Sequence, residues 1–493
     1  MISFEAGVEA LRRFIGRGGD EAYFANETDP LHAAFRAKAT VHAGPIGLPM
    51  LFGAARSKLE SLSSETRTKE AVAYVHVPFC STRCLYCMFY QNPFDEAASH
   101  RYAELLEKEF GLWASRPVQS REAGGEISAL YFGGGTPSVL APRDIEAIVT
   151  AARRELPLAN DCEITLEGRV SDMTEERLEA AARAGVNRLS IGVQTFHGDI
   201  RRAMMRVDGR DGILRAVERM ARFEEFAVVI DLIYGFPMQT EAVWAEDLET
   251  ARNLPIDGID CYQLNVFSRS PLAKRIKTGQ MPPAATLAEA ADRFAASDAV
   301  LSADPRWTRI SNTHWRRTPK ERNRYNTLAK TACDCLAFGS GAGGRIAGHS
   351  FMTERRLKAW EERIEAGEKP VFALLKPTPN WHLMRTIASS VEQGPFNLKA
   401  IGEVFGVDVD RLAKPLLDQW VRAGLLEKSG DVYVPTTAGM FWHVTLAQFL
   451  VTSLTKKLSK NASSLPPQAF ESVFRPVEEG DRKIGRASCR ERV

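Results

Sequence analysis

The chain has 493 residues, of which 44% are hydrophobic and 26% are charged, and this balance is ordinary for a folded protein with more than one domain. The 64 Lys and Arg residues nearly match the 62 Asp and Glu residues, which excludes the strong positive field expected of a nucleic-acid or anionic-membrane binder. No run approaches the roughly 18–20 apolar residues of a membrane span, and the N-terminus lacks the pattern of a signal peptide, so we expect a cytoplasmic protein.

Residues 1–70 are expected to form an N-terminal leader without regular structure over most of its length. A short amphipathic segment runs from Val8 to Phe14, and the following stretch is rich in Pro, Gly and Ala, which favour loops. We expect the leader to pack over the first domain.

A regular alternation of strands and helices begins at residue 71. The predicted strands are short apolar, β-branched runs at residues 71–77, 127–132, 162–167, 188–193, 227–235 and 259–267. Amphipathic helical patterns separate them, and one of these ends at Gly185. This order predicts a parallel sheet over residues 71–268, wound as an open sheet or a partial barrel. In either case, functional side chains belong at the C-terminal ends of the strands.

The alternation stops after residue 268. Residues 269–394 are predicted to form an α+β region, with a strand at 306–315 and a strand that enters a glycine-rich loop over 334–348. Residues 395–482 follow the helix, turn, helix and hairpin order of a winged-helix-like domain, which favours a packing or lid module because no basic stripe accompanies it. Residues 483–493 have several arginines and no apolar periodicity, and are interpreted as a non-native tail.

Three of the eight cysteines follow the first predicted strand directly: Cys80, Cys84 and Cys87. Three thiolates on one loop can bind three irons of a [4Fe–4S] cube and leave the fourth iron open to a ligand. A zinc site completed by His76, or three unrelated thiols, are the alternatives. Structural zinc usually takes its ligands as two separated pairs, and Cys333 and Cys335 lie too close together to be such a pair. The spacing therefore favours a cluster.

The cysteine spacing, framed by YVHVPFC at 74–80 and followed by YFGGGTP at 131–137, resembles the radical S-adenosylmethionine (SAM) enzymes of the oxygen-independent coproporphyrinogen oxidase branch. The resemblance is strong over 71–268 and weaker elsewhere. It implies an α/β fold with a partial (β/α)6 barrel. In that family the open iron binds the amino and carboxylate groups of SAM, and an electron from the cluster splits SAM into methionine and a 5′-deoxyadenosyl radical.

The resemblance also implies a set of cofactor-binding residues at the strand ends: Tyr74, Tyr86, Gly134, Gly135, Thr136, Glu167, Gln194, Arg206 and Asp231. The glycines let the backbone approach the methionine part of SAM. Arg206 matches an arginine that pairs with the SAM carboxylate, and Tyr74 matches a tyrosine on the side of a second SAM. The predicted catalytic residues are Tyr74, Glu167 and His314.

Three groups within this superfamily can be told apart. Coproporphyrinogen oxidases have a fourth cysteine two residues after the third ligand, where this chain has Phe89. Haem chaperones share the C-x-F pattern but are shorter. The anaerobic haem-degrading methyltransferases of the anaerobilin synthase type resemble this chain at CLYCMFY (84–90), THWRRTPKERNRYN (313–326) and DCLAFGSGAGG (334–344), and this group is favoured.

This last resemblance implies a reaction on haem, in which a SAM-derived carbon is transferred to a meso position, the ring opens and iron is released without oxygen. The implied cofactors are a [4Fe–4S] cluster and SAM, with two SAM molecules per turnover. The implied partners are haem and a flavodoxin- or ferredoxin-type electron donor, with no nucleic acid and no membrane span. Radical decarboxylation of coproporphyrinogen and haem delivery without turnover are the alternatives.

The segment at 313–326 supplies predicted haem contacts. His314 could bind iron or act as an acid or base, and the basic residues could hold propionates: Arg316, Arg317, Lys320, Arg322 and Arg324. The alternative is a solvated basic face with a satisfied histidine. Cys333 and Cys335 are interpreted as a buried structural pair, with hydrogen-atom donation to a radical as the alternative.

Overall fold

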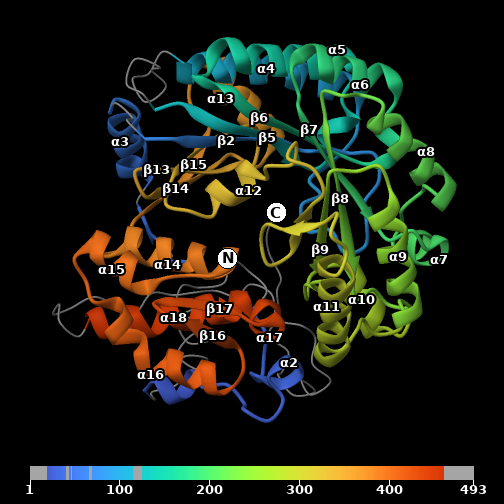
Figure 1. The fold of residues 1–493 in the computed structure, drawn as a ribbon. Helices are drawn as coiled ribbons and strands as arrows, with labels where there is room; N and C mark the ends of the chain where they lie inside the picture. Colours follow the sequence, from blue (N-terminus) through green and yellow to red (C-terminus); the bar gives the residue numbers. More distant parts are fainter. Residues whose placement is uncertain are drawn as a thin grey trace.

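One 13-stranded sheet with a parallel centre organises the computed structural model of the chain (Figure 1). The structure describes residues 19–39, 44–45, 47–50, 52–65, 69–114 and 125–459. The predicted amphipathic segment from Val8 to Phe14 and the predicted tail at 483–493 lie outside the described residues. Within these ranges, none of the helices combines the length and the apolar character that crossing a bilayer requires.

All six strands predicted between residues 71 and 268 are confirmed, and each runs parallel to the next: β2 (Ala71–Val77), β5 (Ile127–Gly134), β6 (Leu158–Gly168), β7 (Arg188–Gln194), β8 (Ala227–Tyr234) and β9 (Gly258–Gln263). A seventh parallel strand, β12 (Asp334–Phe338), pairs with the free side of β2. The sequence did not predict this pairing because it joins residues far apart in the chain.

Helices cover the outer face of this sheet (Figure 1): α4 (Glu96–Ala114), α5 (Pro142–Glu155), α6 (Glu175–Ala184), α7 (Gly198–Ala203), α8 (Arg210–Ala221) and α9 (Glu241–Asn253). Thr174 and Thr240 cap α6 and α9 by accepting a backbone N–H three residues on. Gly185 ends α6 with a φ of 92°, as the sequence predicted. Two 3₁₀ turns, η4 (Pro137–Val139) and η5 (Val170–Asp172), follow β5 and β6.

Antiparallel strands extend both sides of the parallel centre. Next to β9 lie β11 (His314–Arg316) and β10 (Thr308–Arg309), so the strand predicted at 306–315 is a tight hairpin. Next to β12 lie β13 (Gly343–Ile346), β14 (His349–Thr353), β15 (Val371–Lys376) and β1 (Leu48–Pro49). The remaining elements of this region are helical: α10 (Pro271–Lys277), α11 (Leu287–Ser302), α12 (Arg324–Ala329) and α13 (Leu357–Glu365).

The C-terminal elements have the predicted order of helix, turn, helix and hairpin, within α14 (Trp381–Gln393), α15 (Leu398–Phe405), α16 (Val409–Arg422), β16 (Leu426–Ser429), β17 (Val432–Pro435), α17 (Thr437–Phe441) and α18 (His443–Ser459). They gather on one side of the molecule together with α2 (Pro30–Ala33) (Figure 1).

The leader differs from its prediction in two ways. It contains a regular helix, α3 (Phe52–Ser63), which packs against β15. Its earlier part, with η1 (Asp20–Tyr23), packs on the C-terminal helices instead of the first domain, since the Tyr23 ring lies 4.9 Å from that of Phe449 and the indole N–H of Trp442 donates to the carbonyl of Pro30 at 2.9 Å. The packing of buried aromatic rings determines where the leader lies, and such contacts cannot be predicted from sequence periodicity.

The face of the sheet opposite the helices carries polar side chains. Along β7, for example, Arg188 and Ser190 alternate with the apolar residues Leu189 and Ile191, and all four are buried. The barrel interior is therefore polar, and the cysteine loop stands at its C-terminal end, directly after β2.

Candidate active site

The three predicted cluster ligands lie on the loop that follows β2. Cys80 ends the short strand β3 (Phe79–Cys80), which pairs with β4 (Asn92–Pro93). The Thr136 hydroxyl lies 3.2 Å from the sulfur of Cys80, and the backbone N–H of Phe89 donates to Cys87 Sγ at 3.3 Å. These hydrogen bonds stabilise negatively charged sulfur, as a cysteine-bound cluster requires.

Two arginines approach the sulfur of Cys84, which is buried. Arg206 Nη1 lies 3.6 Å and Arg169 Nη2 lies 3.8 Å from Cys84 Sγ. Burial raises the pKa of the Cys80 and Cys87 thiols, so a metal centre must displace protons when it binds there. The donor set around the loop fits an anionic iron–sulfur cluster.

The zinc alternative gains no support from this geometry. His76 is engaged elsewhere, with the Tyr74 hydroxyl 3.0 Å from Nδ1 and the Gln91 amide nitrogen 2.8 Å from Nε2. Burial lowers the pKa of His76 to about 4, so this histidine is neutral.

The glycine triplet after β5 makes room for neighbouring side chains. Gly134 has a φ of 115°, and a Cβ built there would lie 2.6 Å from Nδ1 of His76. A Cβ on Gly133 would lie 2.7 Å from a carboxylate oxygen of Glu167. Glycine is therefore required for close packing within the site, a reason that differs from the predicted approach of a ligand to the backbone.

The negative charges of the acidic residues Glu167 and Asp231 repel each other. Glu167 stands near the end of β6, as predicted, but Asp231 lies in the middle of β8 because that strand continues to Tyr234. Burial, together with the charge of Asp231, raises the pKa of Glu167 to about 8. Burial and the charge of Asp260 raise the pKa of Asp231 to about 7. Close carboxylates in a buried site do not ionise together easily.

Gln194 and Arg206 present unpaired polar atoms to the barrel interior. Gln194 ends β7 with a φ of 74°, and within the described ranges its buried Oε1 has no hydrogen-bond partner. Arg206 is 8% exposed and donates to the Gly192 carbonyl and, at 3.2 Å, to the Tyr86 hydroxyl, but its buried Nε is also unpaired. Buried polar atoms are nearly always paired. An unpaired acceptor and an unpaired cationic donor fit the amino and carboxylate groups of SAM.

A small apolar wall lies beside these two residues. The rings of Tyr86 and Phe236 meet edge to face with centroids 5.4 Å apart. They pack with a cluster that contains Leu85, Met204 and Leu264. A flat aromatic and aliphatic wall of this kind suits a purine ring.

Arg169 is a site residue that the sequence analysis missed. Its guanidinium donates to the hydroxyl and the carbonyl oxygen of Thr82, each at 2.6 Å, and thereby ties the end of β6 to the cysteine loop. Its position two residues after Glu167, at the same strand end, is the signal that could have identified it.

Tyr74 joins an aromatic group inside the barrel. Its ring stacks with those of Tyr131 and Tyr325, at centroid distances of 6.3 and 6.2 Å, and burial raises its pKa well above the usual range. Cys333 and Cys335 belong to one apolar cluster beside this group, and Cys333 donates to the Leu328 carbonyl at 2.9 Å. This supports their interpretation as a structural pair.

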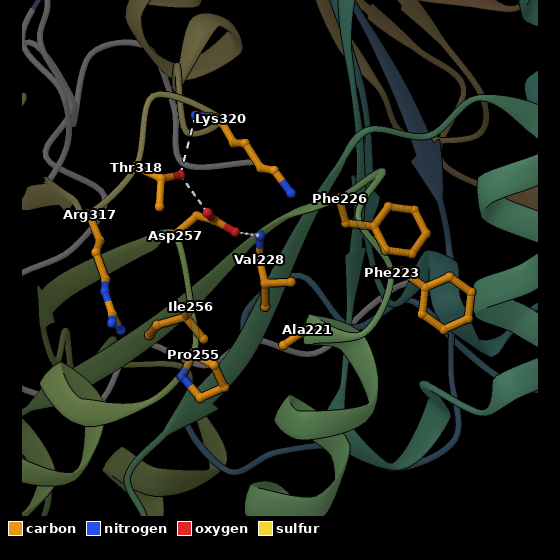
Figure 2. Close-up of a pocket in the computed structure, with 10 residues that line it drawn as sticks. All are labelled: Ala221, Phe223, Phe226, Val228, Pro255, Ile256, Asp257, Arg317, Thr318 and Lys320. Atoms are coloured by element: carbon orange, nitrogen blue, oxygen red, sulfur yellow. Dashed lines mark hydrogen bonds between the residues drawn. The ribbon is translucent and has the colours of Figure 1, made fainter.

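A cavity of about 250 Å³ lies at the opposite end of the strands (Figure 2). Its cations have partners within the protein. Arg317 donates to the Leu254 carbonyl at 2.7 Å and Lys320 to the Glu224 carbonyl at 2.8 Å, close to the ends of α9 and α8. These contacts stabilise helix C-termini, and the cavity is remote from the cysteine loop.

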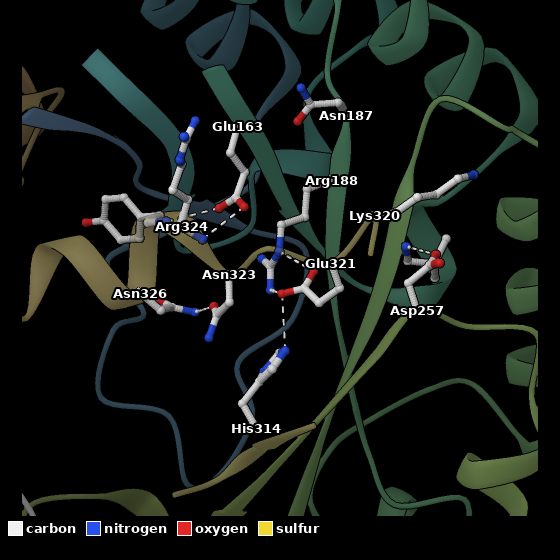
Figure 3. Close-up of polar contacts among 12 residues, drawn as sticks. Glu163, Asn187, Arg188, Asp257, His314, Lys320, Glu321, Asn323, Arg324 and Asn326 are labelled. Atoms are coloured by element: carbon white, nitrogen blue, oxygen red, sulfur yellow. Dashed lines mark hydrogen bonds and ion pairs between the residues drawn. The ribbon is translucent and has the colours of Figure 1, made fainter. Parts of the chain in front are cut away.

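Most of the predicted haem-contact segment is likewise near the N-terminal end of the strands (Figure 3). His314 lies further along, in register with Asp260 of β9. Arg322 and Arg324 bind the Asp161 carboxylate at 3.2 and 2.9 Å. His314 is fully buried between Asp260 and Glu321, at 2.7 and 3.1 Å. Carboxylates and carbonyls of the protein therefore already contact five of the predicted haem-binding side chains: His314, Arg317, Lys320, Arg322 and Arg324. The sixth, Arg316, is exposed.

Comparisons with known proteins agree with this geometry. Residues 74–251 match the radical SAM superfamily. The chain is 40% identical over 392 residues to anaerobilin synthase of Escherichia coli O157:H7. The matched residues make up 79% of this chain and 86% of that protein. It is 32% identical over 207 residues to the heme chaperone HemW of Lactococcus lactis subsp. lactis (strain IL1403), covering 42% and 52% of the two chains. The solved structure of coproporphyrinogen III oxidase (HemN) from Escherichia coli superposes with a TM-score of 0.67, covers 80% of this chain and 93% of its own, and at 21% identity shows a shared fold. The chain therefore belongs to the anaerobilin synthase family of the radical SAM superfamily.

Proposed function

We propose that this protein is a radical SAM methyltransferase that opens haem without oxygen and releases its iron. The observation that carries the proposal is the 40% identity to anaerobilin synthase, which extends over 79% of the chain and so reaches beyond the matched superfamily region at 74–251. The barrel alone would support only membership of the superfamily.

Different residues at the C-terminal end of the barrel bind the cluster and SAM. Cys80, Cys84 and Cys87 hold a [4Fe–4S] cluster, which when bound supplies the electron that cleaves SAM. Arg206 and Gln194 orient the carboxylate and amino groups of SAM through their unpaired buried atoms. The donors near the three sulfurs keep the cluster anionic and fixed in place.

The other side chains of the pocket define the position of the adenosine part of SAM. Tyr86 and Phe236 wall the adenine, and Asp231 accepts hydrogen bonds from the ribose. Fixing the radical carbon against its target is the main contribution of the protein to such chemistry. We assign Glu167 to the same SAM as Asp231, and Tyr74 to a second SAM, which supplies the transferred carbon, so that two SAM molecules are used per turnover.

The proposed reaction also needs an electron source and a reducing compartment. A flavodoxin- or ferredoxin-type protein is the proposed donor, and the cytoplasm is the proposed location, where the seven cysteines of the described ranges, all free thiols in the structure, stay reduced.

The two alternative functions have weaker support. The oxidase likeness rests on fold at 21% identity, and Phe89, which is 66% exposed, stands where coproporphyrinogen oxidases have a further cysteine. The heme chaperone likeness covers 42% of the chain. Neither alternative matches the 40% identity over 79% of the chain that anaerobilin synthase shows.

An anaerobic assay tests the proposal. The reconstituted protein is mixed with haem, a low-potential reductant and SAM that carries a ¹³C-labelled methyl group, and the products are analysed by mass. An opened porphyrin that contains the labelled carbon, together with free iron, is the expected result. Loss of carboxyl groups from coproporphyrinogen in the matched assay would assign the protein to the oxidases. Unchanged haem that co-elutes with the protein would assign it to haem delivery.

A further inference from the structure

Three titratable side chains lie side by side at paired positions on neighbouring strands. Asp231 of β8 pairs in register with Asp260 of β9, and Asp260 pairs with His314 of β11. Side chains at paired positions point to the same face of a sheet and lie a few ångströms apart. Asp260 and His314 are 3% and 0% exposed, whereas Asp231 is only half-buried. Asp231, at one end of this row, therefore reaches the barrel interior, and His314, at the other end, is closed off from solvent.

His314 is held between two carboxylates. Its Nδ1 lies 2.7 Å from Asp260. Its Nε2 lies 3.1 Å from Glu321, which in turn pairs with Arg188 at 2.9 Å (Figure 3). Within the described ranges neither ring nitrogen makes a well-aligned hydrogen bond, so these contacts are ion pairs, which an imidazolium can make with both carboxylates. Burial opposes the charged form, but Asp260 and Glu321 outweigh it and raise the pKa of His314 to about 9. The histidine is therefore a cation at neutral pH.

Charged side chains from separate elements surround this row. Six of them face it: Arg188, Arg206, His314, Asp231, Asp260 and Glu321. Glu163, Glu167, Tyr131 and Tyr262 also border the row, so its acidic groups outnumber its cations. The cation that touches Asp260 is His314, so removal of this imidazolium would leave the full charge of Asp260 acting on Asp231.

We infer that His314 is a positioning residue whose imidazolium holds and compensates Asp260, so that Asp231 on the next strand presents an anionic carboxylate to the ribose hydroxyls of SAM. This inference rests on the SAM pocket of the proposed function and does not depend on the chemistry at haem. His314 acts through Asp260, and this role is distinct from the predicted iron ligand or acid–base catalyst.

The consequence is a defined pH dependence of SAM binding. An anionic Asp231 binds the ribose, so the affinity weakens as the pH falls through the pKa of this carboxyl, which is about 7 without ligand. In His314→Gln, the uncompensated charge of Asp260 makes Asp231 harder to ionise, and the midpoint moves to higher pH. An upward shift of one pH unit corresponds to about a tenfold loss of affinity below the midpoint.

The test measures equilibrium binding of SAM to the cluster-loaded protein under anaerobic conditions between pH 6 and pH 9. We expect His314→Gln to shift the midpoint upward by about one unit or more. The double variant His314→Gln/Asp260→Asn should recover affinity at neutral pH, because it also removes the charge that acts on Asp231. His32→Gln is the matched control, since His32 also lies between two carboxylates, Asp29 and Asp292, but at the surface.

Two outcomes would overturn the inference: a midpoint that His314→Gln leaves unchanged, or a double variant that binds SAM no better than the single one. Iron content and circular dichroism identify a variant that fails to fold. In that event the single variant Asp260→Asn is measured instead. The inference predicts that its midpoint for SAM binding lies at lower pH than that of the wild type. Because the readout is SAM binding, failure of haem opening would refute the proposed function and leave this inference standing.

Discussion

The carboxylate of Glu163 in β6 accepts the backbone N–H groups of Arg324 and Tyr325, at 2.9 and 3.0 Å, and so closes the first turn of α12. The N-cap residue Asn323 has a φ of 51° and its side chain does not cap the helix. A buried acceptor on the sheet therefore replaces the local cap, and it fixes the segment that seals the N-terminal end of the barrel.

Replacement of Glu163 tests this cap. Glu163→Ala leaves two partly buried donors without an acceptor and should lower the free energy of unfolding by about 1–3 kcal/mol. Glu163→Gln keeps one oxygen acceptor and should cost less. Denaturant unfolding measures both. Equal losses in the two variants would show that the charge of Glu163 beside Arg188, and not the cap, matters.

Arg206→Lys should weaken SAM binding by at least about tenfold, since one ammonium cannot reproduce the forked contacts of the guanidinium with Cys84, Tyr86 and Gly192. Equilibrium binding of SAM, with iron content measured in the same samples, is the readout. Arg202→Lys is the control, because Arg202 is on the neighbouring helix α7 with its side chain 73% exposed. Equal affinities for SAM in the two variants would remove Arg206 from the site.

Gly134→Ala should disrupt the pocket, because the new Cβ would lie 2.6 Å from the His76 ring at a φ of 115°. We expect loss of SAM binding and a drop in unfolding free energy of more than about 1 kcal/mol. Gly212→Ala in α8 is the control: no atom lies within 4 Å of its Cβ position, and alanine should stabilise the helix by about 0.5–1 kcal/mol. A Gly134→Ala protein that binds SAM normally would contradict the packing described for the triplet.

Glu109 of α4 should impose a pH dependence on stability. It is fully buried, and burial raises its pKa from 4.5 to about 8. Between these two values the folded protein keeps a proton that the unfolded chain releases, so the free energy of unfolding falls as the pH rises through this window. Glu109→Gln should remove this part of the fall. Denaturant unfolding at several pH values measures it, and identical slopes for wild type and variant would refute the assignment.

Cys84→Ala should abolish the visible absorbance of the cluster and the cleavage of SAM together, because it removes one of three ligands. Cys162→Ala removes a thiol that is equally buried, in β6, and should leave both properties intact. Iron and sulfide content, with 5′-deoxyadenosine as the product assayed, provide the comparison. SAM cleavage that survives in Cys84→Ala would disprove the ligand assignment.

Local pattern in the sequence was sufficient for the parallel strands, and the resemblance to the radical SAM enzymes supplied the candidate site residues. The six strands are continuous apolar runs, and Glu167 and Gln194 could be placed together because they follow parallel strands. Long-range contacts were not predictable. The partners of His314, on β9 and before α12, come from chain segments whose proximity only the fold determines. Arg169 was likewise not predictable, because its part in the site depends on its contact with Thr82.

The pairing of β12 with β2 has a consequence for how the protein is made. During synthesis, β2 emerges long before residues 334–338, and until then the row of backbone donors and acceptors on its open side is exposed along an apolar strand. Such an edge is a template for association between nascent chains. A fragment cut after residue 268 would keep this edge permanently, so we expect it to aggregate.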